Sequence, residues 1–307
     1  MAVCISQTLP AEVEGPPGKP VSAVFPESWQ TPGIAYGVYP LAGGHFECPS
    51  CGGTCQHFDR AVKWAIHEGY RHIDTAQHYE NEEQVSYGIQ SSGVARSEIF
   101  LTTKLTEDTN GRGTTRAALA TSISRMAGLT PDLVEIHYPR NDLAGAWIDL
   151  LEARGAGLCR HVGVSNFEIR HLQRVHAASG VWPPVNQIEF HPLMAAVQLS
   201  AVQFCLERGI AVEGFSPLAQ GQLLANATVH ALARQYGWTP AQLLLKWCIQ
   251  HGVKPLVSAR SVGHLRENIA AYFLTGQISA PDMEAIDHLG PTYRVSKKWN
   301  WDSSREP

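Results

Sequence analysis

The sequence predicts an α/β fold in which eight parallel strands close into a (β/α)8 TIM barrel, and three observations support this. From about Gly33 onward, short apolar runs alternate with longer amphipathic runs, as expected for parallel strands joined by helices. No Gly-x-Gly-x-x-Gly follows the first strand, so the fingerprint of an open dinucleotide-binding sheet is missing. No Pro- or Ser-rich linker divides the middle of the chain. We therefore expect residues 1–307 to form one barrel domain.

The predicted strands are short runs rich in apolar and β-branched residues, as in sheets buried on both faces. They are Ile34–Tyr39, Arg71–Thr75, Ile99–Lys104, Leu133–Tyr138, His161–Val164, Val185–Phe190, Ala211–Phe215 and Pro255–Ser258. The predicted helices lie between them and have apolar residues at helical spacing. They are Phe58–Glu68, Glu82–Gln90, Thr114–Met126, Ala144–Ala153, Ile169–Ser179, Leu199–Arg208 and Pro240–His251.

Helix ends are marked by residues with special backbone preferences. Glycines that can adopt the left-handed conformation follow several predicted helices and should end them, at Gly69, Gly180, Gly209 and Gly252. Thr239 followed by Pro240 predicts a helix start, with the threonine as N-cap and the proline in the first turn.

The two ends of the chain depart from the strand–helix pattern. Residues 1–32 are rich in Pro and Gly, which predicts an N-terminal extension or hairpin over the barrel bottom. Residues 291–307 have little periodicity and are expected to form a C-terminal loop over the barrel mouth.

Composition excludes several classes of protein. Hydrophobic residues make up 44% of the chain and charged residues 17%, which is enough apolar material for a core. The net charge of −4 gives no basic excess for nucleic acid, and no apolar run is long enough to span a membrane. Seven scattered cysteines and an N-terminus unlike a signal peptide favour a cytoplasmic protein. No heptad stripe is present, so a monomer is the default expectation.

Four ionisable residues are predicted to meet at one end of the barrel. Asp74, Lys104 and His137 lie at the ends of three consecutive predicted strands, and Tyr79 lies in the loop after the first of them. In TIM barrels the active site lies at the carboxyl ends of the strands. A lone Lys or Tyr at a loop edge is usually a solvated surface group, but four such residues placed by one rule indicate a catalytic site.

These four residue types suit protonation of an alkoxide that forms from a carbonyl group. A free tyrosine has a pKa near 10, and a nearby ammonium lowers it, so Lys104 is expected to lower the pKa of Tyr79. Asp74 can provide the counter-charge that a buried lysine needs. His137 can orient a substrate carbonyl or assist proton transfer. The set lacks a hydride donor, which a cofactor would have to supply.

Motifs along most of the chain resemble the aldo-keto reductase family. They occur in the family order from about Gly33 to Asn268, and Asp74, Tyr79, Lys104 and His137 match its catalytic tetrad. The motifs are Gly69-Tyr-Arg-His-Ile-Asp-Thr-Ala76, Tyr79-Glu-Asn-Glu82, Thr102-Thr-Lys-Leu105, His137-Tyr-Pro139, Val162-Gly-Val-Ser-Asn-Phe167, Val185-Asn-Gln-Ile-Glu-Phe-His-Pro192 and Phe215-Ser-Pro-Leu218.

The resemblance implies a nicotinamide cofactor across the barrel mouth. Its carboxamide would be held by Ser165, Asn166 and Gln187, and the nicotinamide ring would stack on Phe215, where the family usually has Tyr. The remaining residues implied to bind the cofactor are Ser216 and Leu218 along the pyrophosphate and Glu267 and Asn268 on the adenine side.

The site for a 2′-phosphate departs from the family pattern. Ser258 and His264 stand where the family has Lys and Arg, so both expected cations are absent. Arg260 and Arg266 lie close in sequence and could substitute, since arginine binds phosphate well. NADP(H) is therefore the expected cofactor, with NAD(H) as an alternative.

The loop after the first strand also departs from the family. Tyr39 stands where the family often has Trp, and a long Gly- and Cys-rich segment follows. We interpret this segment mainly as a flexible loop without metal. Cys48, Cys51 and Cys55, with His45 or His57, form a weaker zinc alternative, because only one Cys-x-x-Cys pair is present.

The predicted function is reduction of an aldehyde or ketone by a nicotinamide cofactor, with Tyr79 as general acid. An apolar pocket for a small carbonyl substrate is expected from Tyr39, Tyr138, Phe190 and either Trp299 or Trp301. Three alternatives remain: a cofactor-binding barrel without catalysis, a dehydrogenase acting in the alcohol-to-carbonyl direction, and a barrel isomerase or lyase without cofactor.

Overall fold

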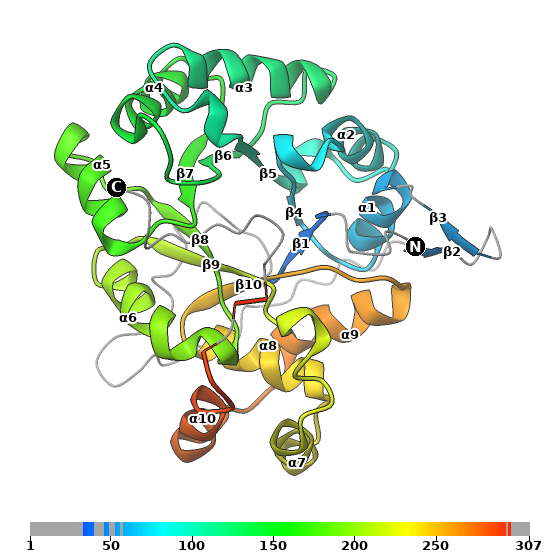
Figure 1. The fold of residues 1–307 in the computed structure, drawn as a ribbon. Helices are drawn as coiled ribbons and strands as arrows, with labels where there is room; N and C mark the ends of the chain where they lie inside the picture. Colours follow the sequence, from blue (N-terminus) through cyan, green and yellow to red (C-terminus); the bar gives the residue numbers. More distant parts are fainter. Residues whose placement is uncertain (1–32, 40–45, 49–52, 56–57, 293, 296–307) are drawn as a thin grey trace.

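The computed structural model describes residues 33–39, 46–48, 53–55, 58–292 and 294–295. Eight parallel strands close into a barrel in the order β1-β10-β9-β8-β7-β6-β5-β4, and helices surround it (Figure 1). The TIM-barrel prediction is therefore confirmed. Each strand pairs in register with the strands before and after it, and Gly37 of β1 lies opposite Asp74 of β4 where the barrel closes.

The barrel strands are short, and nearly every residue in them is buried. They are β1 (Ala35–Gly37), β4 (His72–Asp74), β5 (Phe100–Leu105), β6 (Leu133–Ile136), β7 (His161–Ser165), β8 (Val185–Glu189), β9 (Ala211–Phe215) and β10 (Val253–Val257).

The helices turn their apolar sides toward the barrel. They are α1 (Phe58–His67), α2 (Glu82–Gln90), α3 (Thr114–Arg125), α4 (Leu143–Gly155), α5 (Ile169–Ser179), α6 (Ala195–Leu206), α7 (Ala227–Tyr236), α8 (Pro240–Gln250), α9 (Val262–Phe273) and α10 (Ala280–Asp287). Trp147 of α4 and Trp247 of α8 are fully buried in the layer between helices and strands. This burial of large apolar surface is the main force that holds the helices on the barrel.

The predicted helix ends are confirmed. Gly180 and Gly209 adopt φ angles of 72° and 69°, in the left-handed region that favours glycine. The Thr239 hydroxyl accepts a hydrogen bond from the Gln242 N–H, and the Gln242 side chain accepts one from the Thr239 N–H. This reciprocal capping fixes the start of α8 shortly after the end of α7.

Several boundaries differ from the predictions. Helix α6 begins at Ala195 rather than Leu199, and helices α7, α9 and α10 were not among the predicted helices. Strand β10 begins at Val253 rather than Pro255. The earlier start brings a charged residue, Lys254, into the strand, where it is buried in the barrel.

The Gly- and Cys-rich segment contains a short hairpin instead of only a loop. Strands β2 (Phe46–Cys48) and β3 (Gly53–Cys55) pair antiparallel and lie outside the barrel (Figure 1). Cys51, His45 and His57 lie outside the described residues. For Cys48 and Cys55 only the backbone is described. The zinc alternative therefore stays a prediction.

Both predicted terminal segments fall largely outside the described residues. The extension 1–32 is not described, and of the loop 291–307 only residues 291, 292, 294 and 295 are. Val295 is buried, and its N–H donates to Glu189 at 2.6 Å, which ties the start of this loop to the end of β8. Within the described part of the chain, no helix is long and apolar enough to cross a membrane.

Candidate active site

Three consecutive strands bring the predicted tetrad to one end of the barrel. Asp74 is the last residue of β4, Lys104 lies near the end of β5, and His137 directly follows β6. Parallel strands place their carboxyl ends at the same rim, so residues far apart in sequence become neighbours there. Tyr79 lies in the same place, with its ring centroid 5.3 Å from Lys104 Nζ and 5.8 Å from the His137 ring.

Asp74 and Lys104 form an ion pair inside the barrel. Lys104 Nζ donates to the two Asp74 carboxylate oxygens at 2.6 and 2.7 Å and to the Thr75 carbonyl at 3.1 Å. The Lys104 side chain is fully buried and the Asp74 side chain nearly so. All three donors of the ammonium therefore have partners. Asp74, Tyr79 and Glu135 raise the pKa of Lys104 despite burial, so the ammonium stays charged.

A network of buried amides fixes the turn that carries Tyr79. Tyr79 ends a 3-10 helix, Gln77–Tyr79, and Glu80 then adopts the left-handed conformation with φ of 54°. The Thr75 hydroxyl donates to Asn81 Oδ1 at 2.7 Å, and Asn81 Nδ2 donates to the Val38 carbonyl at 2.9 Å. Asn81 thus joins both ends of this turn to the loop after β1, which holds the tyrosine over the ion pair.

The pKa of Tyr79 is raised to about 12, because burial outweighs the opposing effects of Lys104. The charge of Lys104 and a hydrogen bond to it act in the expected direction, but they do not bring the pKa below 10. The expectation of a lowered pKa is therefore wrong for the protein without cofactor. A phenol with this pKa is fully protonated at neutral pH, as a proton donor must be.

His137 is a neutral side chain at the same rim. Burial and the charge of Lys104 lower its pKa well below the ordinary value. Among the described residues its Nδ1 atom has no hydrogen-bond partner. The ring stacks on Tyr138, with centroids 4.5 Å apart. A neutral imidazole with an unused nitrogen can hydrogen-bond a ligand in the mouth.

The three residues expected around a carboxamide lie together at the ends of β7 and β8. Asn166 Nδ2 donates to Ser165 Oγ at 3.1 Å and to the His137 carbonyl at 3.0 Å. The Ser165 hydroxyl donates to the Gln187 carbonyl at 3.1 Å. Asn166 also has a φ of 63°, a strained conformation that such sites often contain. These bonds connect the three residues to the tetrad through His137.

The loop after β9 is also strained. Ser216, Ala219 and Gln220 all have positive φ angles, although none of them is glycine. Successive residues with such angles can turn backbone N–H groups toward an anion. Phe215 ends β9 beside this loop and is partly exposed, and Leu218 is half-buried against both core clusters. This arrangement fits an aromatic platform followed by a phosphate-binding turn.

The adenine side was predicted around β10 and α9, where both candidate arginines, Arg260 and Arg266, are exposed. Arg266 forms a two-pronged ion pair with Glu68, at 2.7 and 2.9 Å. Arg260 is exposed in the loop between β10 and α9. The Ser258 hydroxyl donates to the Gly37 carbonyl at 2.7 Å. His264 is exposed, Glu267 is half-buried and Asn268 is buried on the same helix.

Two of the predicted pocket walls lie beside the tetrad. The Tyr39 ring is 5.0 Å from the Tyr79 ring, and Tyr138 stacks on His137. Phe190 was wrongly predicted as a wall, because it is fully buried and stacks on Trp247 at 4.8 Å in the layer behind the barrel. Trp299 and Trp301 lie outside the described residues.

The Aldo/keto reductase family model matches residues 54–291, which include the whole tetrad. The chain belongs to the aldo-keto reductase family. It is accordingly an NAD(P)H-dependent oxidoreductase.

Similar aldo-keto reductases are known from bacteria and animals. Glyoxal reductase of Bacillus subtilis is 39% identical over 236 residues, covering 76% of this chain and 84% of the relative. An aldo-keto reductase of Mycolicibacterium smegmatis is 41% identical over 248 residues, covering 77% of this chain and 88% of the relative. The crystal structure of a Bombyx mori aldo-keto reductase in complex with NADP has a TM-score of 0.78 at 31% identity, covering 89% of this chain and 93% of that one.

The sequence reasoning missed a group of charged residues inside this aldo-keto reductase barrel. Glu135 of β6, Glu213 of β9 and Lys254 of β10 are all buried below the tetrad. The signal was present in the sequence, since each is a single charge within an otherwise apolar strand. These charges lie within the strands, whereas the predicted site residues lie at the strand ends.

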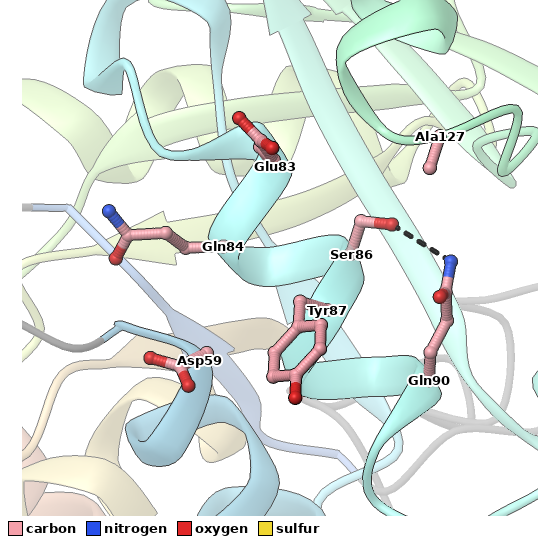
Figure 2. A pocket seen from close by; sticks show the side chains of 7 residues that line it. All are labelled: Asp59, Glu83, Gln84, Ser86, Tyr87, Gln90 and Ala127. Carbon is pink, nitrogen blue, oxygen red and sulfur yellow. Dashed lines mark hydrogen bonds between the residues drawn. The ribbon is translucent and has the colours of Figure 1, made fainter.

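A separate hollow of about 420 Å³ lies on the outer side of the helices, between α1 and α2 (Figure 2). Its lining includes none of the tetrad residues. It comprises Asp59, Glu83, Gln84, Ser86, Tyr87, Gln90 and Ala127. Within α2, Gln90 Nε2 donates to Ser86 Oγ at 3.2 Å, and the Tyr87 side chain is largely exposed. The hollow is not part of the candidate active site.

Proposed function

We propose that this enzyme reduces a small aldehyde or ketone to the alcohol, with Tyr79 as the general acid. The observation that carries the proposal is the buried Asp74–Lys104 ion pair beside a protonated Tyr79, at the carboxyl end of the barrel. Glyoxal reductase, the name of one relative, supports a small reactive carbonyl compound as substrate.

Each member of the tetrad has a role that follows from its environment. Tyr79 holds a proton at neutral pH and can donate it to the oxygen of a carbonyl group that is gaining negative charge. Lys104 then stabilises the resulting phenolate, because its ammonium lies next to the ring. Asp74 keeps this ammonium charged and in place. Neutral His137 can orient the carbonyl oxygen by a hydrogen bond.

The residues around the mouth fit a nicotinamide cofactor. A bound reduced nicotinamide would supply the hydride to the carbonyl carbon. Gln187 Nε2 donates to carboxylates inside the barrel, so its amide oxygen is left to accept from a carboxamide N–H. Ser165 and Asn166 complete this subsite, and Phe215 gives an aromatic surface for the ring.

NADP(H) is the proposed cofactor. Arg260 is a surface arginine in the β10–α9 loop, where a 2′-phosphate is expected, and one similar structure is a complex with NADP. Arginine and phosphate form strong charge-assisted hydrogen bonds. NAD(H) remains the alternative that a direct comparison of kcat/KM for the two cofactors would test.

The experiment that tests the reaction compares wild type with Tyr79→Phe. The variant keeps the ring but loses the proton, so kcat for a reactive aldehyde is expected to fall by about 10²–10⁴. Cofactor binding, followed by quenching of tryptophan fluorescence, should stay the same. Retention of most of the activity in Tyr79→Phe would contradict the proposal.

The same experiment separates the alternatives. Wild type that binds the dinucleotide but reduces no member of a carbonyl panel would be a non-catalytic barrel. Faster oxidation of alcohols than reduction of carbonyls at neutral pH would indicate the reverse direction. Absence of any dinucleotide binding would favour an isomerase or lyase.

A further inference from the structure

A second set of buried polar residues lies beneath the tetrad inside the barrel. We call it the interior acid cluster, and it consists of Glu135, Glu213, Lys254 and the amide of Gln187. The registers place these residues on neighbouring strands, since Gln187 of β8 lies opposite Glu213, and Glu213 lies opposite Lys254. Glu135 lies opposite Lys104 on β5. The cluster therefore begins directly below the catalytic ion pair.

The Gln187 amide is the hub of the cluster. Its Nε2 atom lies 2.9 Å from Asp74 Oδ2, 3.1 Å from Glu213 Oε2 and 3.3 Å from Glu135 Oε2. A side-chain amide has only two hydrogens, so it cannot fully satisfy three carboxylates. Three carboxylates around one atom would also repel one another strongly in a dry interior. One of the three carboxyl groups must therefore carry a proton.

The surrounding charges identify Glu135 as the protonated group. Asp74 has Lys104 as its counter-charge, and Glu213 has Lys254 opposite it on β10. Glu135 shares Lys104 with Asp74, and the described residues offer it no cation of its own. The titratable and charged groups that face Glu135 or its neighbour Glu213 are Asp74 and His72 from β4, Lys104 from β5, Glu213 from β9 and Lys254 from β10.

The remaining contacts of the cluster agree with this assignment. Burial and the charge of Glu213 raise the pKa of Glu135 well above its usual range. Burial also raises the pKa of Glu213, but only to about 7, because the charge of Lys254 and the hydrogen bond from Gln187 oppose it. Among the described residues, neither Glu135 Oε1 nor Glu213 Oε1 has a hydrogen-bond partner. His72, which lies 3.7 Å from Glu213, is not a competing cation, because burial and the two lysines lower its pKa well below the ordinary value.

We propose that Glu135 and Glu213 are positioning residues for the reduction, which hold the Gln187 amide from below with Glu135 protonated and Glu213 ionised. Gln187 is then fixed with its nitrogen toward the acids and its oxygen toward the cofactor site. Asp74, the third partner of the same nitrogen, is fixed under Tyr79 in the same way. Only the expected effect on kcat rests on the proposed function, because the protonation of Glu135 can be measured without turnover.

Loss of the Glu135 proton would disturb the tetrad. A third carboxylate beside Asp74 adds negative charge below Lys104 and Tyr79, which raises the proton affinity of the phenol further and makes it a poorer donor. Activity should therefore fall at alkaline pH, before Tyr79 itself loses its proton with a pKa of about 12. We therefore expect kcat to decline at alkaline pH as Glu135 loses its proton.

Infrared spectroscopy of the intact protein tests the protonated state without turnover. At neutral pH, wild type should show the carbonyl stretch of a protonated carboxylic acid, which disappears at alkaline pH. Glu135→Gln should lack this band. Glu189→Gln is the matched control, because Glu189 is a buried glutamate at the end of β8 that accepts from the Val295 N–H, and the band should remain. Absence of the band in wild type at neutral pH would overturn the proposal.

The stability of the fold gives a second test. The folded-state pKa of Glu135 is raised, so its contribution to stability is present below the ordinary glutamate pKa and is lost as pH rises through the folded value. In that window the folding equilibrium constant of wild type should fall by up to about tenfold per pH unit more than that of Glu135→Gln. Equal slopes in urea unfolding series would contradict the assignment.

Kinetics connect the cluster to the reaction. The alkaline decline in kcat of wild type should be absent in Glu135→Gln, which mimics the protonated acid, and present in Glu189→Gln. The same decline in Glu135→Gln would show that Glu135 does not position the site. Failure of the infrared test alone overturns the cluster, whereas a chain with the band but no carbonyl turnover would overturn the proposed function and leave the protonated acid in place.

Discussion

The two halves of the barrel mouth differ in how their charged residues are exposed to solvent. On the side of β4, β5 and β6, Asp74 and Lys104 are buried and bonded to each other before any ligand arrives. On the side of β10 and α9, Arg260 and His264 lie at the surface. The first half is preorganised by desolvated charge, and the second is open to solvent.

This difference teaches where the enzyme fixes its chemistry and where it can vary. A buried ion pair with all its donors satisfied holds one geometry, because a misplaced or missing partner leaves an uncompensated charge. A solvated arginine costs little to replace and can be gained or lost without harm to the fold. We therefore expect substitutions in the buried ion pair to slow the reaction greatly, and substitutions at the surface arginine to change the cofactor preference without harm to the fold.

The largest effect that would test this comparison is expected for Lys104→Met. The change leaves Asp74 buried without its cation, so the free energy of unfolding should fall by about 3–5 kcal/mol. Loss of the cation beside Tyr79 should also lower kcat by about 10²–10⁴. Urea unfolding and steady-state kinetics with one reactive aldehyde measure the two effects.

Lys246→Met is the matched control for this variant. Lys246 of α8 is also buried, but its ammonium donates to the Leu274 carbonyl and not to a residue of the tetrad. Its replacement should change stability and leave kcat as in wild type. A similar loss of kcat in both variants would mean that Lys104 acts only through stability.

An intermediate effect is expected at the solvent-exposed half, from Arg260→Ala. If this arginine binds a 2′-phosphate, its loss removes a charge-assisted hydrogen bond worth about 1.5–3 kcal/mol, or roughly 10–150-fold in kcat/KM for NADPH. The value for NADH should change little. Arg266→Ala serves as the control, since Glu68 already binds this guanidinium. Equal loss with both cofactors would contradict a role in phosphate recognition.

The smallest effect is expected for Asn81→Ala, which loosens the Tyr79 turn without removing a charge. The Thr75 hydroxyl and the Val38 carbonyl lose their partner in a buried place, so stability should fall by about 1–3 kcal/mol. A modest fall in kcat should accompany this loss, because Tyr79 is less firmly held. Asn226→Ala, which removes the N-cap of α7, should cost about 1 kcal/mol and leave kcat intact.

Much of the fold could be predicted because its signals are local. Gly180, Gly209, Thr239 and Pro240 mark helix ends by their own backbone preferences, and all four act as expected. Helices α7, α9 and α10 were not predicted, because most helical stability in proteins comes from tertiary packing, which the local sequence does not show. Strand β10 was predicted to begin at Pro255 and begins at Val253, so it also contains Lys254, a charge that a buried strand holds only when the fold supplies a partner.

The sequence by itself determined the barrel, the family and the identity of the tetrad, because periodicity and motif order are properties of the chain alone. Only the tertiary structure decided which arginine is engaged with Glu68, where Phe190 is buried, and which carboxyl groups meet at Gln187. It also reversed the expected direction of the Tyr79 pKa, since burial depends on every element that closes over the phenol. Distances and desolvation arise from contacts between residues remote in sequence, and no single segment encodes them.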